Sequence, residues 1–81
     1  MVKLLFPNHF QVRMLERGIS VDHVKSAIKN PDFTETVFQG RIKARKEIED
    51  GRVIEVIYYR QGFKGANDYV IITAYYTTNE E

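Results

Sequence analysis

The sequence predicts one α+β domain, in which two N-terminal helices are followed by a four-stranded antiparallel sheet. Apolar residues recur with helical spacing up to residue 30, and from Thr34 onward they alternate with a period of two. Asp50-Gly51 between two alternating segments is typical of a β-hairpin. The chain has 81 residues, which suits a single domain over 1–81, with a loose tail expected at 78–81.

The first helix is expected to begin at Pro7-Asn8, with Asn8 as its N-cap, and to end at Gly18. Its buried stripe consists of Phe10 and Met14, extended by Val12 and Leu15.

The second helix is expected to start after an N-cap at Ser20, with Asp22 near its positive end, and to stop at Asn30-Pro31. Two short helices joined by a tight turn need a sheet to pack against. The predicted buried face of the second helix consists of Val21, Val24, Ala27 and Ile28.

The four strands are predicted at 34–38, 41–49, 52–60 and 69–76, with a flexible loop over 61–67. If Asp50 and Gly51 alone form the hairpin turn, Glu49 faces Arg52 and Lys46 faces Glu55, which pairs opposite charges. The face expected to meet the helices then carries Ile42, Ala44, Ile48, Val53, Ile57 and Tyr59, and the other carries Arg41, Lys43, Arg45, Glu47, Ile54, Val56 and Tyr58. On the last strand, Val70, Ile72, Ala74 and Tyr76 are expected in the core.

Composition narrows the class of protein. The chain has no cysteine and two histidines, so neither a disulfide framework nor a zinc site is expected, and no cofactor is predicted. No apolar run reaches membrane-spanning length, and the first residues are too short for a signal peptide, so a cytoplasmic protein without a membrane partner is expected. The net charge is +1, yet four of the six residues from Arg41 to Lys46 are basic.

The first helix places His9, Arg13 and Arg17 at successive i, i+4 positions on one stripe. Arginine matches phosphate oxygens and histidine transfers protons near neutral pH, so this stripe suits a phosphodiester ligand. The same residues also fit a solvated polar face, with Glu16 pairing one arginine. His23, at the start of the second helix, is interpreted as a surface or capping residue.

Lys43 and Arg45 share a strand face and form a basic row, which fits either phosphate binding or protection of an edge strand by charge. Tyr58 and Tyr75 are candidates for stacking nucleobases, although aromatic residues in strands also serve simple packing. Thr73 lies in an apolar strand and needs a hydrogen-bond partner if it is buried.

The string His9-x-x-x-Arg13-Met14-x-x-Arg17-Gly18-Ile19-Ser20, followed by Val24 and Asn30-Pro31, resembles the start of the family DUF4258. The later basic strand, the hairpin and Val70-Ile71-Ile72-Thr73-Ala74-Tyr75 are similar to it too. That family is regarded as similar to the metal-independent RNase superfamily of RelE-type toxins, barnase and EndoU nucleases. The resemblance implies a RelE-like (BECR-like) fold, helices first and then a four-stranded antiparallel sheet.

The resemblance also implies a function: RNA cleavage through the 2′-hydroxyl, by a toxin-type endoribonuclease. His9 would be the general base or acid, and Thr73 and Tyr75 would complete the site. RNA, including ribosome-associated RNA, and a protein antitoxin would be the partners. These roles require the ring of His9 to reach the cations on the sheet. The alternative is a non-catalytic protein-interaction or dimerisation module, including a homodimer, suggested by the aromatic last strand. The cations that the resemblance assigns to the phosphate are Arg13, Arg17, Lys43 and Arg45.

Overall fold

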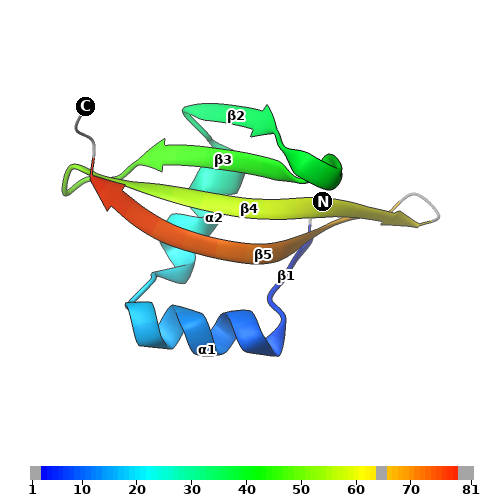
Figure 1. Ribbon diagram of the computed structural model, residues 1–81, viewed down its shortest axis with the longest axis horizontal. Coiled ribbons are helices and arrows are strands. Elements are labelled where there is room, and N and C mark those ends of the chain that lie inside the picture. Colours follow the sequence, from blue (N-terminus) through cyan, green and yellow to red (C-terminus); the bar gives the residue numbers. More distant parts are fainter. Residues whose placement is uncertain (1–2, 64–65, 79–81) are drawn as a thin grey trace.

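A five-stranded mixed sheet carries two helices on one face in the computed structural model (Figure 1), which describes residues 3–63 and 66–78. The elements are β1 (Lys3–Leu5), α1 (Asn8–Arg17), α2 (Val21–Lys29), β2 (Phe33–Thr36), a 3₁₀ turn (Phe38–Gly40), β3 (Ile42–Glu47), β4 (Arg52–Phe63) and β5 (Ala66–Thr78), and the strand order is β1-β5-β4-β3-β2. The α+β class and the two helices are confirmed. Four antiparallel strands follow the helices as predicted, but a fifth strand, β1, precedes the helices and makes the sheet mixed.

The unpredicted strand, β1, precedes the helices and pairs in parallel with β5, where Leu4 is opposite Tyr69. Three residues are too few to show a period of two, and the partner strand lies at the other end of the chain, so no local pattern reveals this pairing. β1 covers the outer side of β5 only at Asp68–Val70, and its pairing does not reach Tyr75 or Tyr76.

Helix α1 ends at Gly18, whose φ of 67° is the left-handed conformation predicted for that position. Pro7 is the N-cap and Asn8 the first helical residue, and neither position provides a side-chain capping bond. Phe10 and Met14 are buried as expected. Val12 and Leu15 are exposed, because they lie on the flanks of a stripe that only two residues of this short helix fill.

Helix α2 follows Ser20, which occupies the predicted N-cap without a side-chain hydrogen bond. Val21 is exposed, whereas Val24, Ala27 and Ile28 are buried. Both helices pack on one face of the sheet. The core between the helices and the sheet contains Phe10, Met14, Ile19, Val24, Ala27, Ile28, Ala44, Ile48, Ile54, Val56, Tyr58, Ile71 and Ala74.

The β3–β4 hairpin closes through a three-residue loop rather than the predicted two-residue turn. Gly51 donates its N–H to the carbonyl of Ile48 at 3.0 Å, and Ile48 donates to the carbonyl of Arg52 at 2.9 Å. Gly51 has φ 91°, as expected for the bulge position of a three-residue hairpin loop. The register therefore differs by one residue from the prediction, and Arg45 is opposite Glu55.

A one-residue change of register moves every side chain of a strand to the other face. The predicted face of β3 is confirmed, because Ala44 lies against the helices. The predicted face of β4 is wrong: Ile54, Val56 and Tyr58 face the helices. Val53, Glu55, Ile57 and Tyr59 therefore lie on the opposite face, together with Lys43 and Arg45. We call this surface, which no helix of the described residues covers, the open face.

A bulge in β5 alters the predicted alternation of the last strand. Thr73 is opposite Ile57 and Ile71 is opposite Tyr58, which leaves Ile72 as an extra residue. As a result Ile71 and Ala74 both face the helices, while Thr73 and Tyr75 lie on the open face. Within the predicted loop over 61–67, the strands continue to Phe63 and resume at Ala66. Residues 64–65 and most of the predicted tail, 79–81, lie outside the described residues.

Candidate functional site

Four side chains form a row across the open face, one from each of four neighbouring strands. Phe33 on β2 is opposite Arg45 on β3, Arg45 is opposite Glu55 on β4, and Glu55 is opposite Tyr75 on β5. Side chains at paired positions share a face, so the four stand side by side. We call Phe33, Arg45, Glu55 and Tyr75 the central row. The adjacent row consists of Glu35, Lys43, Ile57 and Thr73.

Glu55 is the chemically unusual member of the central row, because it is a carboxylate with only 8% of its surface exposed. Its oxygens lie 3.3 Å from Nε of Arg45 and 3.6 Å from Nζ of Lys43. The hydroxyl of Tyr75 donates a hydrogen bond to it at 2.9 Å. A buried charge is stable only when paired and hydrogen-bonded, and these three groups provide that environment.

Tyr75 remains a hydrogen donor at neutral pH. Burial raises the pKa of its phenol, and the hydrogen bond to Glu55 raises it further. The site therefore holds a carboxylate that accepts protons and a hydroxyl that donates one, in direct contact.

The two cations of the site are only partly engaged. Nε of Arg45 is buried but makes no hydrogen bond, because its 3.3 Å contact with Glu55 is an ion pair without hydrogen-bond geometry. Lys43 lies between Glu55 and Glu35, with Nζ 3.9 Å from the Glu35 carboxylate. Two cations thus face two carboxylates, so an incoming anion has to displace one of the carboxylates.

The residues predicted from sequence divide between the two sides of the sheet. Lys43, Arg45, Thr73 and Tyr75 come together on the open face. His9, Arg13 and Arg17 are exposed on α1, in the helical layer on the other side (Figure 1). Arg17 donates to the carbonyl of Ala74 at 3.4 Å. The imidazole of His9 and the basic row of β3 therefore do not form one cleft.

Tyr58 belongs to neither group. It is buried in the core, with its ring centroid 4.9 Å from that of Tyr69. The one-residue register difference explains this position, since it turns Tyr58 away from Lys43 and toward the helices. The same difference brings Glu55 to Arg45, which is why sequence reasoning missed Glu55; a three-residue hairpin loop ending in Gly51 would have indicated it.

A second polar cluster joins α2, β5 and the β3–β4 hairpin. Ser20 donates its backbone N–H to the hydroxyl of Tyr76 at 3.1 Å, and Nδ1 of His23 lies 2.8 Å from the same oxygen. Because the carboxylate of Glu49 can only accept, we assign the ring hydrogen of His23 to Nε2, which leaves Nδ1 to accept the hydroxyl hydrogen of Tyr76. Nε2 then faces the carboxylate of Glu49 at 3.3 Å.

The sequence predicts only a surface or capping role for His23. Its two side-chain partners are 26 and 53 residues away, so no local signal points to them. The guanidinium of Arg52 covers the ring of Tyr76 at 4.1 Å. The cluster fastens the start of α2 to the sheet, and we interpret it as a structural clasp.

Within residues 3–63 and 66–78, no three histidine, cysteine, aspartate or glutamate side chains gather closely enough to hold a metal ion. Among the described helices, none combines the length and apolar character needed to cross a membrane.

Comparison with known proteins identifies the family but not an activity. A search of curated proteins gave no match to this sequence. Residues 6–76 match DUF4258, which is described as a domain of unknown function. The matched segment contains both helices, the hairpin and the open-face residues, and spans most of the chain. The chain therefore belongs to the DUF4258 family.

Proposed function

We propose that this domain is a metal-independent, toxin-type RNase that cleaves RNA through the 2′-hydroxyl, and that the reaction takes place on the open face. The observation that carries the proposal is the environment of Glu55. A nearly buried carboxylate touches two cations and a phenol on an otherwise uncovered sheet surface. Titratable groups that converge in this way on an accessible surface are typical of catalytic sites.

The chemistry requires a base, an acid and cations at the phosphate. In the proposal Glu55 removes the hydrogen of the 2′-hydroxyl, and the resulting 2′-oxygen attacks the adjacent phosphorus. The bond from phosphorus to the 5′-oxygen breaks, and Tyr75 gives its hydrogen to that leaving oxygen. The products are a 2′,3′-cyclic phosphate and a 5′-hydroxyl. Glu55 then returns its proton to Tyr75 along their 2.9 Å hydrogen bond, which restores the site.

Lys43 and Arg45 would stabilise the charge that develops on the phosphate, as fixed cations do in phosphoryl chemistry. Thr73 stands beside Tyr75 on the open face and is suited to hydrogen-bond a phosphate oxygen. The family resemblance implies that His9 is the general base or acid, but in this proposal the general base is Glu55. The reason is that α1, which carries His9, lies in the opposite layer from the cations.

The test is cleavage of free and ribosome-bound RNA by the purified protein, with product ends identified. We expect Glu55→Gln to reduce cleavage about 10²–10⁴-fold, the usual effect of losing a general base, and Arg45→Ala to reduce it to a similar degree. His9→Ala is the matched control and should cleave normally. A substrate with deoxyribose at the scissile position should resist cleavage.

Two outcomes count against the proposal. If RNA stays intact at high enzyme concentration, the domain is not a nuclease. If His9→Ala abolishes cleavage while Glu55→Gln does not, the site lies on α1. Expression toxicity that Glu55→Gln relieves would support a toxin that is neutralised by a protein antitoxin.

A second candidate function is a non-catalytic interaction or dimerisation module, and the surface of the helical layer favours it. Leu15 is 85% exposed, and with Val21 it forms an apolar patch around one hollow. Apolar patches on small proteins often mark protein-binding surfaces. Sizing chromatography of the protein and of Leu15→Lys tests it: a dimer that the substitution dissociates supports the module. The hollow in this patch, of about 270 Å³, is lined by Gln11, Met14, Leu15, Ile19 and Val21.

A further inference from the structure

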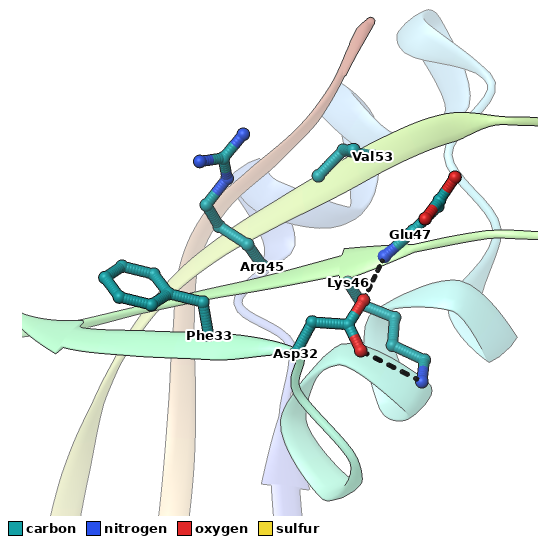
Figure 2. A pocket seen from close by; sticks show the side chains of 6 residues that line it. All are labelled: Asp32, Phe33, Arg45, Lys46, Glu47 and Val53. Atoms are coloured by element: carbon teal, nitrogen blue, oxygen red, sulfur yellow. Dashed lines mark hydrogen bonds and ion pairs between the residues drawn. The ribbon is translucent and has the colours of Figure 1, made fainter. Parts of the chain in front are cut away.

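A shallow hollow of about 190 Å³ adjoins the central row at its β2 end. Figure 2 shows the ring of Phe33 and the guanidinium of Arg45 rising from neighbouring strands, with Val53 on the next strand. The hollow is therefore continuous with the cation site, because Arg45 belongs to both. Its lining consists of Asp32, Phe33, Arg45, Lys46, Glu47 and Val53.

The position of Phe33 is the unexplained feature of this hollow. The side chain is 52% exposed on an edge strand, although an aromatic ring gains most from burial. Beside it the guanidinium of Arg45 offers a second flat surface, and the side chain of Val53 is buried beneath the surface. A planar ligand with apolar faces and polar edges matches this combination.

The acidic rim of the hollow does not exclude an anionic ligand. Asp32 has both oxygens engaged: one accepts the backbone N–H of Glu47 at 2.8 Å, and the other lies 3.7 Å from Nζ of Lys46. The dashed lines in Figure 2 mark these two contacts. The charge of Asp32 is thus locally balanced, and Arg45 is the cation that joins the hollow to the central row.

We propose that this hollow binds one unstacked nucleobase of single-stranded RNA, with the base lying on the ring of Phe33 and the neighbouring phosphate on Arg45 and Lys43. The proposal deepens the proposed function by naming single-stranded RNA as the substrate class, and it rests on that function only for the choice of nucleic acid as ligand. Base stacking on an exposed aromatic ring accepts any base, because every base has a flat face.

The geometry along the central row is consistent with such a ligand crossing the strands. Neighbouring strands are about 4.8 Å apart, so Phe33 stands roughly 5 Å from Arg45 and roughly 10 Å from Glu55. A base on Phe33 therefore leaves its own phosphate at the cations and the next sugar near Glu55.

The experiment measures binding without cleavage. Fluorescence anisotropy is recorded with a fully 2′-O-methylated RNA hexamer, which lacks the reacting hydroxyl, and with an abasic oligomer of the same length and charge. Phe33→Ala should weaken binding of the base-bearing hexamer about 5- to 150-fold, the range for losing one base–aromatic stack. Binding of the abasic oligomer should not change.

Two further variants sharpen the comparison. Phe38→Ala is the matched control, since Phe38 is 81% exposed, lies outside the hollow and should not affect either ligand. Phe33→Trp keeps and enlarges the stacking surface, so it should bind the hexamer at least as tightly as the original protein does.

The inference is overturned if Phe33→Ala weakens binding of both ligands equally, or if Phe38→Ala weakens binding of the hexamer as much as Phe33→Ala does. It is also overturned if Phe33→Trp binds the hexamer more weakly while circular dichroism shows an intact fold, or if the original protein does not bind the hexamer measurably. A dimer that Phe33→Ala dissociates would instead assign the hollow to a second copy of the chain. The binding inference and the proposed RNase activity are tested separately, because the methylated hexamer binds without being cleaved. If the original protein binds the hexamer through Phe33 but does not cleave RNA, this inference stands and the proposed RNase activity is rejected.

Discussion

Tyr75 donates its phenolic hydrogen to Glu55 across the β4–β5 pair, with 2.9 Å between the two oxygens. Sequence separates these residues by 20 positions, and only the observed register makes them neighbours. The contact joins a hydrogen donor to a carboxylate that two cations also hold. It can be tested without assuming any activity.

Alkaline titration followed by tyrosinate absorbance tests this contact. Burial, and after it the bond to Glu55, raises the pKa of Tyr75 above the ordinary value of 10.0. A raised phenol pKa stabilises the fold fully below about pH 10, and this contribution is lost as the pH rises through the folded-state pKa. Glu55→Gln should lower the pKa of Tyr75 but not restore the ordinary value, because burial remains.

The variant Tyr75→Phe identifies the transition that belongs to Tyr75, and exposed Tyr59 provides the matched control through Tyr59→Phe. Identical titration curves for the original protein and Glu55→Gln would show that the hydrogen bond does not affect the phenol.

The loop of the β3–β4 hairpin offers a test of the register. Gly51 has φ 91°, and a β-carbon added there would meet no heavy atom within 4 Å. Gly51→Ala should therefore destabilise the protein only through backbone strain, by about 1–2 kcal/mol in urea unfolding. Gly51→Asn should lose less, because asparagine tolerates the left-handed region. Equal stability of the glycine and alanine forms would rule out the three-residue loop.

This hairpin also shows how far sequence could predict the fold. Helical spacing, Gly18 and Ser20 placed both helices correctly, because those signals are local. The Asp50-Gly51 pair correctly predicted a hairpin, but it is compatible with loops of two and of three residues. The one-residue difference in loop length decides which face of β4 meets the helices, and therefore whether Glu55 lies in the candidate site.

The bulge at Ile72 likewise changes which side chains of β5 share a face. Strict alternation placed Ile71 and Thr73 on one face, whereas the extra residue separates them. The candidate cations Lys43 and Arg45 were found because β3 has no such irregularity and a basic alternation is visible in the sequence. Their partners Glu55 and Phe33 could not be predicted from the sequence. The position of Glu55 depends on the length of the hairpin loop, and that of Phe33 depends on β2, whose bounds differ from the predicted 34–38.

The clasp between α2 and β5 yields a stability prediction. Tyr76→Phe removes the oxygen that accepts the N–H of Ser20 and contacts Nδ1 of His23. Both groups are partly buried, so the loss should be about 1–2 kcal/mol in urea unfolding. Tyr59→Phe, at an exposed tyrosine, should have almost no effect. A Tyr76→Phe protein as stable as the original would show that water replaces these bonds without cost.

The pairing of Glu55 with both cations leads to a final prediction, in which binding and catalysis respond in opposite directions. In the free protein the carboxylate occupies the position that the proposed mechanism gives to the phosphate, within 3.6 Å of both Lys43 and Arg45. RNA must displace it, so the carboxylate lowers the affinity for RNA. Glu55→Gln keeps the shape of the side chain and removes the charge.

This variant should therefore bind a non-cleavable 2′-O-methyl RNA about two- to tenfold more tightly, as expected for releasing partly exposed ion pairs, while its cleavage activity falls. The affinity should also depend more steeply on salt, because the negative charge of Glu55 no longer offsets the two cations at the phosphates. Glu35→Gln, at the more distant and exposed partner of Lys43, should have a smaller effect. Weaker RNA binding by Glu55→Gln would mean that the carboxylate organises the cations for RNA rather than competing with it, since a competitor's removal can only free them.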